Sequence, residues 1–292
     1  MNIRVSPQEL RADQMSAAKV EQAAEAIATD GYVILDVVVA HEHLDVLHVK
    51  MTEDSQKLLR AEKWGGAGNV RGHLQQGAPP MAPYVFRDIV SNPFVIQVTK
   101  RVLGNGVTGP GGKMFNSFYG GNTNCPGSQE QALHRDHPHL WPDLEQAHPP
   151  FAVAIHIPLV QVTEENGATE LWPGSHLNTK AFLGGSFMEA AGPIDDDDVA
   201  AQRQIAPPIR AETEKGSIVI RDMRLWHRGM TNHSNEIRHM INMNHCMYWR
   251  VRRQTLRFAA GCEAAFDSTD LDHNAVFTDE PIDYLTGETV GA

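Results

Sequence analysis

Apolar residues in the first third of the chain recur at intervals of three and four positions, which is the period of an amphipathic helix. This spacing predicts helices over Ala17–Ala28 and His41–Leu59. A third helix is predicted to have Pro93 at its first position, where proline is favoured, and to end before Gly104. Between the first two helices, the short apolar run Tyr32–Leu35 predicts a buried strand.

The pattern changes after Gly104, where Gly and Pro become frequent and short runs alternate between apolar and polar residues. A period of two is typical of strands with one buried face. The runs that predict strands are Met114–Tyr119, Phe151–Leu159, Ser217–Arg221 and Arg238–Trp249. Many short strands with Gly/Pro turns favour a sandwich or a barrel, of which the jelly roll is one type. The polar stretch His176–Pro208 has no strong period and predicts a long loop, either disordered or a lid, with Asp195–Asp198 exposed.

No internal repeat and no low-complexity linker divides the 292 residues. We therefore predict one domain over residues 1–292, mainly β with helical decoration. Its expected parts are a helical N-terminal part (1–104), a β core (about 105–250) and a C-terminal extension (251–292).

Charge and composition narrow the class of protein. The chain has 25 Lys+Arg and 36 Asp+Glu, a net charge of −11, which argues against a general nucleic-acid surface because neutralising phosphates requires a Lys/Arg excess. No apolar run approaches the roughly 18 residues of a membrane span, and the N-terminus lacks the apolar segment of a secretory signal. The three cysteines form no CxxC pair, as is common in a reducing compartment. We expect a cytoplasmic protein without nucleic-acid or membrane partners, and a homodimer stays open.

The 15 histidines direct attention to metal binding. On a strand, His134 and Asp136 would share one face and offer an imidazole and a carboxylate together. A second histidine would complete a 2-His-1-carboxylate facial triad, which suits Fe(II) and leaves open coordination positions. The candidate is His227, which follows a predicted strand and turn 91 residues after Asp136. Arg238, 11 residues further on, opens the next predicted strand and could bind a carboxylate through both arms of its guanidinium.

These residues resemble the phytanoyl-CoA dioxygenase family. The resemblance rests on His134-Arg135-Asp136, on Glu165–Thr169 with Trp172–His176, and on His227 and Arg238, and it spans roughly Asp30 to Trp249. Members of this family are Fe(II)- and 2-oxoglutarate-dependent oxygenases with a double-stranded β-helix core, a jelly roll of the cupin-like type. The resemblance therefore implies that fold, and an enzyme that oxidises a small organic molecule with release of succinate and CO2.

The resemblance also implies roles for single residues, with O2 and 2-oxoglutarate as cosubstrates. The implied Fe(II) ligands are His134, Asp136 and His227. The implied cosubstrate residues are Arg238, for the distal carboxylate of 2-oxoglutarate, and Thr169, for a hydroxyl contact. Family members often have Gln next to the first histidine or two residues before it, where this chain has Arg135 and Ala132, so a second cosubstrate contact is not assigned. Because related halogenases lack the carboxylate ligand, Asp136 favours hydroxylation or another oxidation over chlorination.

Two other interpretations remain open at this stage. His137 and His139, with Glu145 six residues further on, could form a cupin-type metal site, although Pro138 is unfavourable in a central strand and local packing also accounts for these histidines. The chain could also be an idle member that binds a small ligand without turnover. An intact ligand set argues against that, and metal-dependent turnover of 2-oxoglutarate would distinguish the two.

Overall fold

The computed structural model describes residues 1–61, 70–104, 113–180 and 194–285. Its helices are α1 (Pro7–Ala12), α2 (Ala17–Asp30), α3 (His41–Arg60), α4 (Arg87–Val90), α5 (Pro93–Leu103) and α6 (Asp196–Ile205). Its longer strands are β2 (Tyr32–Asp36), β4 (Met114–Asn124), β5 (Ala152–Pro158), β8 (Ile218–Asp222), β10 (Arg238–Cys246), β11 (Leu256–Ala259) and β13 (Ala275–Thr278). The shorter strands are β1 (Asn2–Arg4), β3 (His73–Leu74), β6 (Glu170–Leu171), β7 (Ile209–Arg210), β9 (His227–Arg228) and β12 (Leu271–Asp272).

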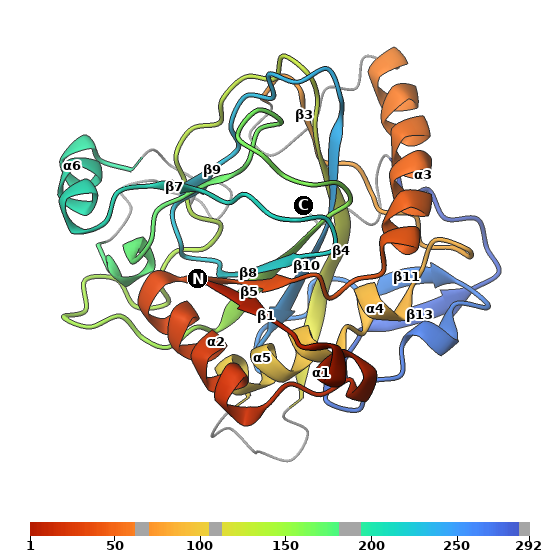
Figure 1. The fold of residues 1–292 in the computed structure, drawn as a ribbon, viewed down its shortest axis with the longest axis horizontal. Coiled ribbons are helices and arrows are strands. Elements are labelled where there is room, and N and C mark those ends of the chain that lie inside the picture. The colour runs from red at the N-terminus through yellow and green to blue at the C-terminus, as the bar shows by residue number, and fades with distance from the viewer. Residues whose placement is uncertain (62–69, 105–112, 181–193, 286–292) are drawn as a thin grey trace.

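Two sheets enclose the centre of the molecule (Figure 1). The main sheet has the strand order β1-β2-β8-β5-β10-β4-β12, with β3 also paired to β4, and its central strands are antiparallel. The smaller sheet has the order β7-β6-β9. This is a mainly β fold with helical decoration, and its core is the predicted double-stranded β-helix.

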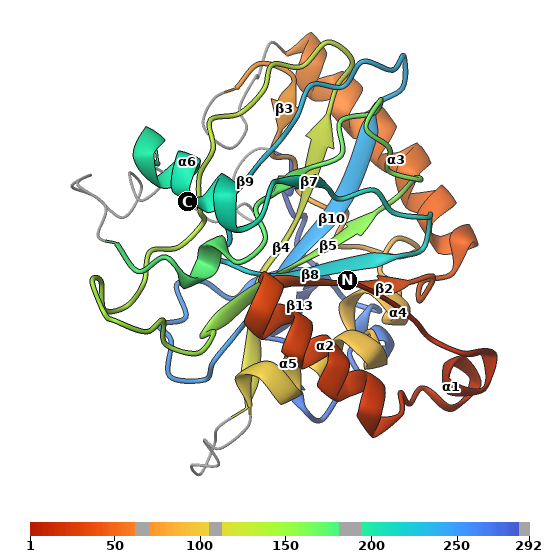
Figure 2. The same ribbon diagram turned by 60° about the vertical axis from the view of Figure 1, so that its left-hand side comes forward.

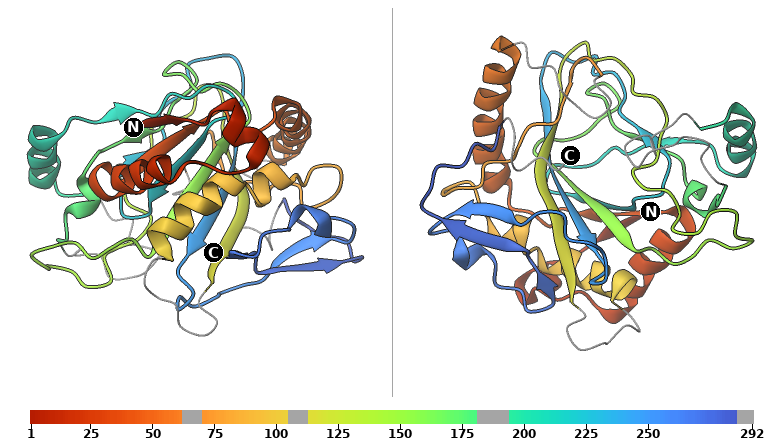
Figure 3. Two further views of the ribbon diagram at one scale, coloured as in Figure 1. Left: turned by 60° about the horizontal axis from the view of Figure 1, so that its bottom comes forward. Right: turned by 180° about the vertical axis from the view of Figure 1, so that it is seen from behind.

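Residues of the central strands alternate between two environments, as strand geometry requires. One set packs into the main hydrophobic core, and its members on these strands are Val153, Ile155, Ile157, Ile218, Ile220, Ile241 and Met243. The apolar faces of α2, α3 and α5 complete that core from outside, and Figures 2 and 3 show α2 and α5 side by side across this face of the sheet. The intervening residues point inward and line a cavity. The same alternation therefore builds the core and the candidate site.

Local signals place the helices that cover this sheet. The Ser16 side chain accepts the backbone N–H of Lys19 at the start of α2, and Gly31, at φ 83°, ends the helix in a left-handed conformation. The Asn92 side chain caps α5 by accepting two backbone N–H groups, and Pro93 occupies the first turn. All three predicted helices and all five predicted strands are confirmed, with ends that differ by a few residues.

The part predicted to be helical, 1–104, contributes more strand than expected. Besides the predicted strand, now β2, residues 2–4 form β1 and pair in parallel with β2, and residues 73–74 form β3 beside β4. Strands of two or three residues are too short to show a period of two, which is why the pattern of apolar residues does not predict them.

The prediction of a loop over His176–Pro208 is wrong at its C-terminal end. Residues 196–205 form α6, and Asp195 caps it by accepting the backbone N–H of Asp197. Asp196, Asp197 and Asp198 occupy the first turn, where negative charge offsets the positive end of the helix dipole. The acidic run is therefore a helix start. Residues 181–193, with Gly184 and Gly185, lie outside the described residues.

The C-terminal extension packs against the core. β11 and β13 pair in parallel (Figure 3). β12 pairs with β4 at the edge of the main sheet. Phe258 of β11 is fully buried and lies 5.0 Å from Tyr119 of β4, measured between ring centroids. Within the described part of the chain, no helix is both long and apolar enough to cross a membrane.

Candidate metal centre

His134, Asp136 and His227 lie together in the wall of the cavity. Their donor atoms all lie within 4.8 Å of one another, and among the described residues this is the one group of three or more His, Cys, Asp or Glu side chains that does so. The Oδ1 atom of Asp136 is 3.8 Å from Nε2 of His134 and 3.5 Å from Nε2 of His227. The structure thus brings together the three residues that the sequence singles out.

Backbone hydrogen bonds hold this arrangement. The N–H of His134 donates to the carbonyl of His227 at 3.0 Å, and the N–H of His227 donates to the carbonyl of His134 at 2.8 Å. The expected strand through His134 and Asp136 is reduced to this isolated bridge. The N–H of Asp136 instead donates to the carbonyl of Met223, in the turn after β8, and so does the N–H of His137. Pro138, which has no backbone N–H to donate to a ladder, follows directly.

Hydrogen bonds at Nδ1 of both imidazoles mark Nε2 as the atom that would bind a metal. Nδ1 of His134 lies 2.8 Å from the carbonyl oxygen of Ala132, and Nδ1 of His227 lies 3.0 Å from that of Leu225. A carbonyl oxygen only accepts, so each Nδ1 donates its N–H, and Nε2 is the ring nitrogen that would bind the metal. Burial, with the nearby cation of Arg221, holds the pKa of His227 well below its usual value. His227 is therefore neutral, as a metal ligand must be.

Asp136 supplies the negative charge of the group. Burial raises its pKa, but the opposing attraction of Arg221 and the two histidines outweighs this and holds the pKa of Asp136 well below its usual range. Nη2 of Arg221 donates to Oδ2 of Asp136 at 2.5 Å, while Oδ1 faces the histidines. Two imidazoles and one ionised carboxylate fit Fe(II), which accepts this mixture of ligands.

The cavity beside these residues has a volume of about 370 Å³ and is lined from both sheets. Thr169 and Leu171 line it from the smaller sheet's side, and inward-facing residues of β4, β5, β8 and β10 line it from the main sheet. All five residues singled out in the sequence, including Thr169 and Arg238, contribute to its wall.

Arg238 opens β10 and lines this cavity. It is buried, and its Nε and Nη2 donate to the carbonyls of Asn166 and Gly167, both at 3.2 Å. Nη1 has no hydrogen-bond partner among the described residues. Burial and the nearby Arg210 lower the pKa of Arg238 to about 10, so it stays a cation at neutral pH. A buried cation with an unused N–H suits a carboxylate ligand.

The Glu165–Thr169 segment explains how Arg238 is held. Gly167 has φ 82°, and a Cβ atom there would lie 2.3 Å from Nδ2 of Asn124 and 2.8 Å from the carbonyl oxygen of Met230. Only glycine fits this turn without displacing its neighbours. The turn presents two carbonyls to Arg238 and so fixes the direction of its guanidinium.

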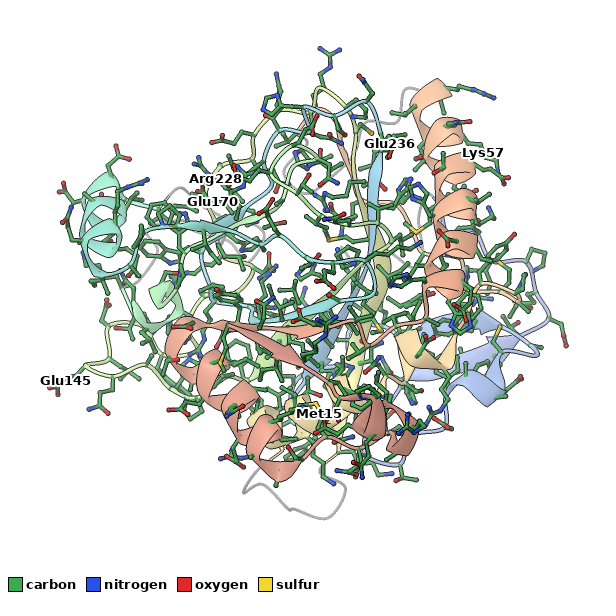
Figure 4. The ribbon with its side chains drawn as sticks, in the orientation of Figure 1. Met15, Lys57, Glu145, Glu170, Arg228 and Glu236 are labelled. Carbon is green, nitrogen blue, oxygen red and sulfur yellow. The ribbon has the colours of Figure 1, made fainter. Side chains whose placement is uncertain are left out.

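The Trp172–His176 segment holds the backbone of Trp226, the residue before His227. The buried Ser175 hydroxyl accepts the backbone N–H of Trp226, and the N–H of Trp172 donates to the carbonyl of Trp226. Ser175 is thus a structural residue next to His227. Beyond it, Arg228 and Glu170 form an ion pair at 2.8 Å, and Figure 4 shows these two side chains side by side.

Arg135 and Ala132, which stand where family members often have glutamine, do not line the cavity. Arg135 is buried and donates to the carbonyls of Asn178 and Lys180. Gln131, three residues before His134, does line the cavity, and its side-chain oxygen accepts the N–H of Gly229 at 2.7 Å.

The residues of the cupin-type alternative do not come together. The His137 ring contacts Phe151 and lies near Arg250, whereas the His139 ring contacts His148. Figure 4 shows Glu145 at the outer edge of the molecule, where its side chain is exposed.

Sequence reasoning missed part of the cavity wall. It placed Arg221 only at the end of a predicted strand and did not single out His156 or Asn242, yet all three line the cavity and are linked by hydrogen bonds. For Asn242 the signal was present, because residues two apart on a strand share a face and Asn242 lies four residues after Arg238 on β10.

A family model and two curated relatives match this chain. The family model "Phytanoyl-CoA dioxygenase (PhyH)" matches residues 27–240. The chain is 29% identical over 151 residues to "Dioxygenase af480" of Aspergillus fumigatus, covering 50% of this chain and 40% of that protein. It is 25% identical over 236 residues to "Dioxygenase trt7" of Aspergillus terreus, covering 77% of this chain and 72% of that protein.

Two solved structures share the fold. AviO1 from Streptomyces viridochromogenes superposes with a TM-score of 0.53 at 18% identity, covering 81% of this chain and 99% of that chain. SnoK, described as a non-heme alpha ketoglutarate dependent carbocyclase from nogalamycin biosynthesis, gives a TM-score of 0.53 at 19% identity, covering 80% and 85%. The family model spans most of the chain and includes His134, Asp136, His227 and Arg238. The chain therefore belongs to the phytanoyl-CoA dioxygenase (PhyH) family.

Proposed function

We propose that this protein is an Fe(II)- and 2-oxoglutarate-dependent oxygenase that hydroxylates, or otherwise oxidises, a small organic molecule and releases succinate and CO2. One observation carries the proposal: a single cavity contains a His-Asp-His donor set and a buried arginine with an unused N–H. Family membership supports the same activity.

In this proposal each residue has one task. His134, Asp136 and His227 hold Fe(II), and Arg238 holds the distal carboxylate of 2-oxoglutarate. Thr169, on the same cavity wall, offers its hydroxyl to the cosubstrate. With 2-oxoglutarate and O2, the iron supplies the oxidation of an unactivated C–H bond. The protein orients the reactants and limits the access of water to them.

The test is metal-dependent turnover of 2-oxoglutarate. Succinate release is measured with Fe(II), with Zn(II) in its place, and without metal, for the parent protein and for His227→Ala. We expect succinate only from the parent protein with Fe(II), increased by a true substrate. Tight binding of Fe(II) and 2-oxoglutarate with no succinate from any candidate substrate would instead support the idle binding protein.

A further inference from the structure

Arg221, on β8, is a second buried guanidinium in the cavity, and its neighbours fix how it is oriented. Nδ1 of His156 donates to the side-chain oxygen of Asn242 at 2.8 Å, so Nε2 of His156 keeps a lone pair. That lone pair accepts the Nε–H of Arg221 at 3.0 Å. Burial, with Arg221 beside it, lowers the pKa of His156 to about 3, so this imidazole stays neutral and remains an acceptor.

The other end of the guanidinium has an unused donor. Nη2 donates to Oδ2 of Asp136, but Nη1 of Arg221 is buried and has no hydrogen-bond partner among the described residues. An unpartnered buried N–H of a cation is costly, which points to a ligand that accepts from it. Nη2 also lies 3.1 Å from Nε2 of His227. A metal ion on that nitrogen would use the same lone pair, which would leave Arg221 with still more donor capacity.

The balance of charge in the cavity indicates the charge of the ligand that Arg221 would bind. Among the described residues that line the cavity, the cations are Arg221 and Arg238, and the one carboxylate is Asp136. Under the proposed function, Fe(II) and doubly charged 2-oxoglutarate neutralise each other, with Arg238 on the distal carboxylate. Asp136 can balance only one of the two arginines. One positive charge remains in a site of low dielectric constant, where it is expensive without a partner.

We infer that the substrate carries an anionic group, most simply a carboxylate, that binds the Arg221 guanidinium beside the metal. This inference rests on the proposed function and adds the chemical class of its substrate. The rest of the wall agrees, because three asparagines, Asn122, Asn242 and Asn244, line the cavity and can hydrogen-bond the remainder of a small polar acid. A second source of the same group is the carboxylate of 2-oxoglutarate next to its keto group, and the experiment separates the two sources.

The experiment compares matched acids and amides as probes. Butanoate and benzoate are titrated against butanamide and benzamide by ligand-observed NMR, on protein loaded with Zn(II) and N-oxalylglycine, an unreactive analogue of 2-oxoglutarate. The parent protein should bind each acid about tenfold or more tightly than its amide, as a charge-assisted hydrogen bond predicts. Arg221→Gln should lose this preference, and Arg221→Lys should keep part of it because lysine retains the charge. Arg101→Gln removes a cation from a surface ion pair with Glu21 and should behave like the parent protein.

A parallel titration measures 2-oxoglutarate affinity through the visible charge-transfer absorption of its Fe(II) chelate without oxygen. We expect Arg221→Gln to change this affinity less than threefold. Equal binding of acids and amides to the parent protein overturns the inference, as does a preference that survives in Arg221→Gln. A tenfold loss of 2-oxoglutarate affinity in Arg221→Gln, without any acid preference in the parent, assigns Arg221 to the cosubstrate instead. Absence of the absorption in the parent protein contradicts the proposed function, while the acid–amide comparison still tests the anion site.

Discussion

His134 and His227 exchange two backbone hydrogen bonds, at 3.0 and 2.8 Å, and their ring centroids lie 4.3 Å apart. The two residues are far apart in the chain, yet one antiparallel bridge sets the relative position of both imidazoles. Because the bridge is made by backbone atoms, replacing either side chain should remove a metal donor and leave the strand pairing in place.

Asp136→Gly should abolish hydroxylation. It removes the one anionic donor of the proposed ligand set, and Fe(II) is then held by two neutral imidazoles. Chloride is expected to bind in the position that the carboxylate leaves, without efficient halogenation. The measurement is iron content and product analysis by mass spectrometry, with and without chloride. Asp270→Gly, which removes a surface carboxylate paired with Lys100, is the control. Hydroxylation at the parent rate in Asp136→Gly would show that Asp136 is not a ligand.

Arg238→Ala should weaken 2-oxoglutarate binding and leave iron binding nearly unchanged. A charge-assisted pair in this buried pocket contributes about 2–4 kcal/mol, or roughly one and a half to three orders of magnitude in the apparent constant. The apparent 2-oxoglutarate constant of Arg238→Lys should lie between those of the parent protein and Arg238→Ala, because lysine keeps the charge but lacks the paired N–H donors of the guanidinium. The measurement is a 2-oxoglutarate titration against succinate release at saturating iron.

If Arg238→Ala leaves the apparent 2-oxoglutarate constant unchanged, another arginine binds the distal carboxylate of 2-oxoglutarate. Arg224 binds Asp222 through both arms of its guanidinium, and Arg228 pairs with Glu170. Neither lines the cavity, so Arg221 would be the next residue to test.

Thr169→Val tests the proposed hydroxyl contact without changing the side chain's shape. Loss of one hydrogen bond should raise the apparent 2-oxoglutarate constant about three- to tenfold. Thr169→Ser keeps the hydroxyl and should stay near the parent value. If the valine and serine variants both match the parent protein, Thr169 lines the cavity without contacting the cosubstrate.

Gly167→Ala should lower both stability and 2-oxoglutarate affinity. The added Cβ would clash with Asn124 and with the Met230 carbonyl, in a backbone conformation that costs about 1–3 kcal/mol for other residues. Movement of the turn would also shift the carbonyl that accepts from Arg238. Gly127→Ala is the matched control, because Gly127 also has a positive φ of 71° but nothing lies within 4 Å of its added Cβ. A thermal melt and a 2-oxoglutarate titration on both variants separate backbone strain from the clash.

Long elements with a repeated apolar face could be predicted from the sequence. Residues 17–30 and 41–60 bury such faces, and this signal depends only on neighbours within the same helix. α6 could not be predicted that way, because Gln202 is its one buried residue and its signal lies in the cap at Asp195.

One part of the candidate site could likewise be predicted from the sequence, and another part could not. The donor set could be predicted because its residue types and order carry the chemistry. The role of Arg221 could not, because the pairing of β8 with β2 and β5 decides which of its faces points into the cavity. That pairing joins segments far apart in the chain.

The most direct test of the central claim is an anaerobic titration of Fe(II) and 2-oxoglutarate followed by visible absorption. The account predicts a charge-transfer band that saturates at one Fe(II) and one 2-oxoglutarate per chain. It also predicts that His134→Ala and His227→Ala lose the band while they keep the parent's circular dichroism spectrum. No band in the parent protein, or a full band in His227→Ala, would contradict the account.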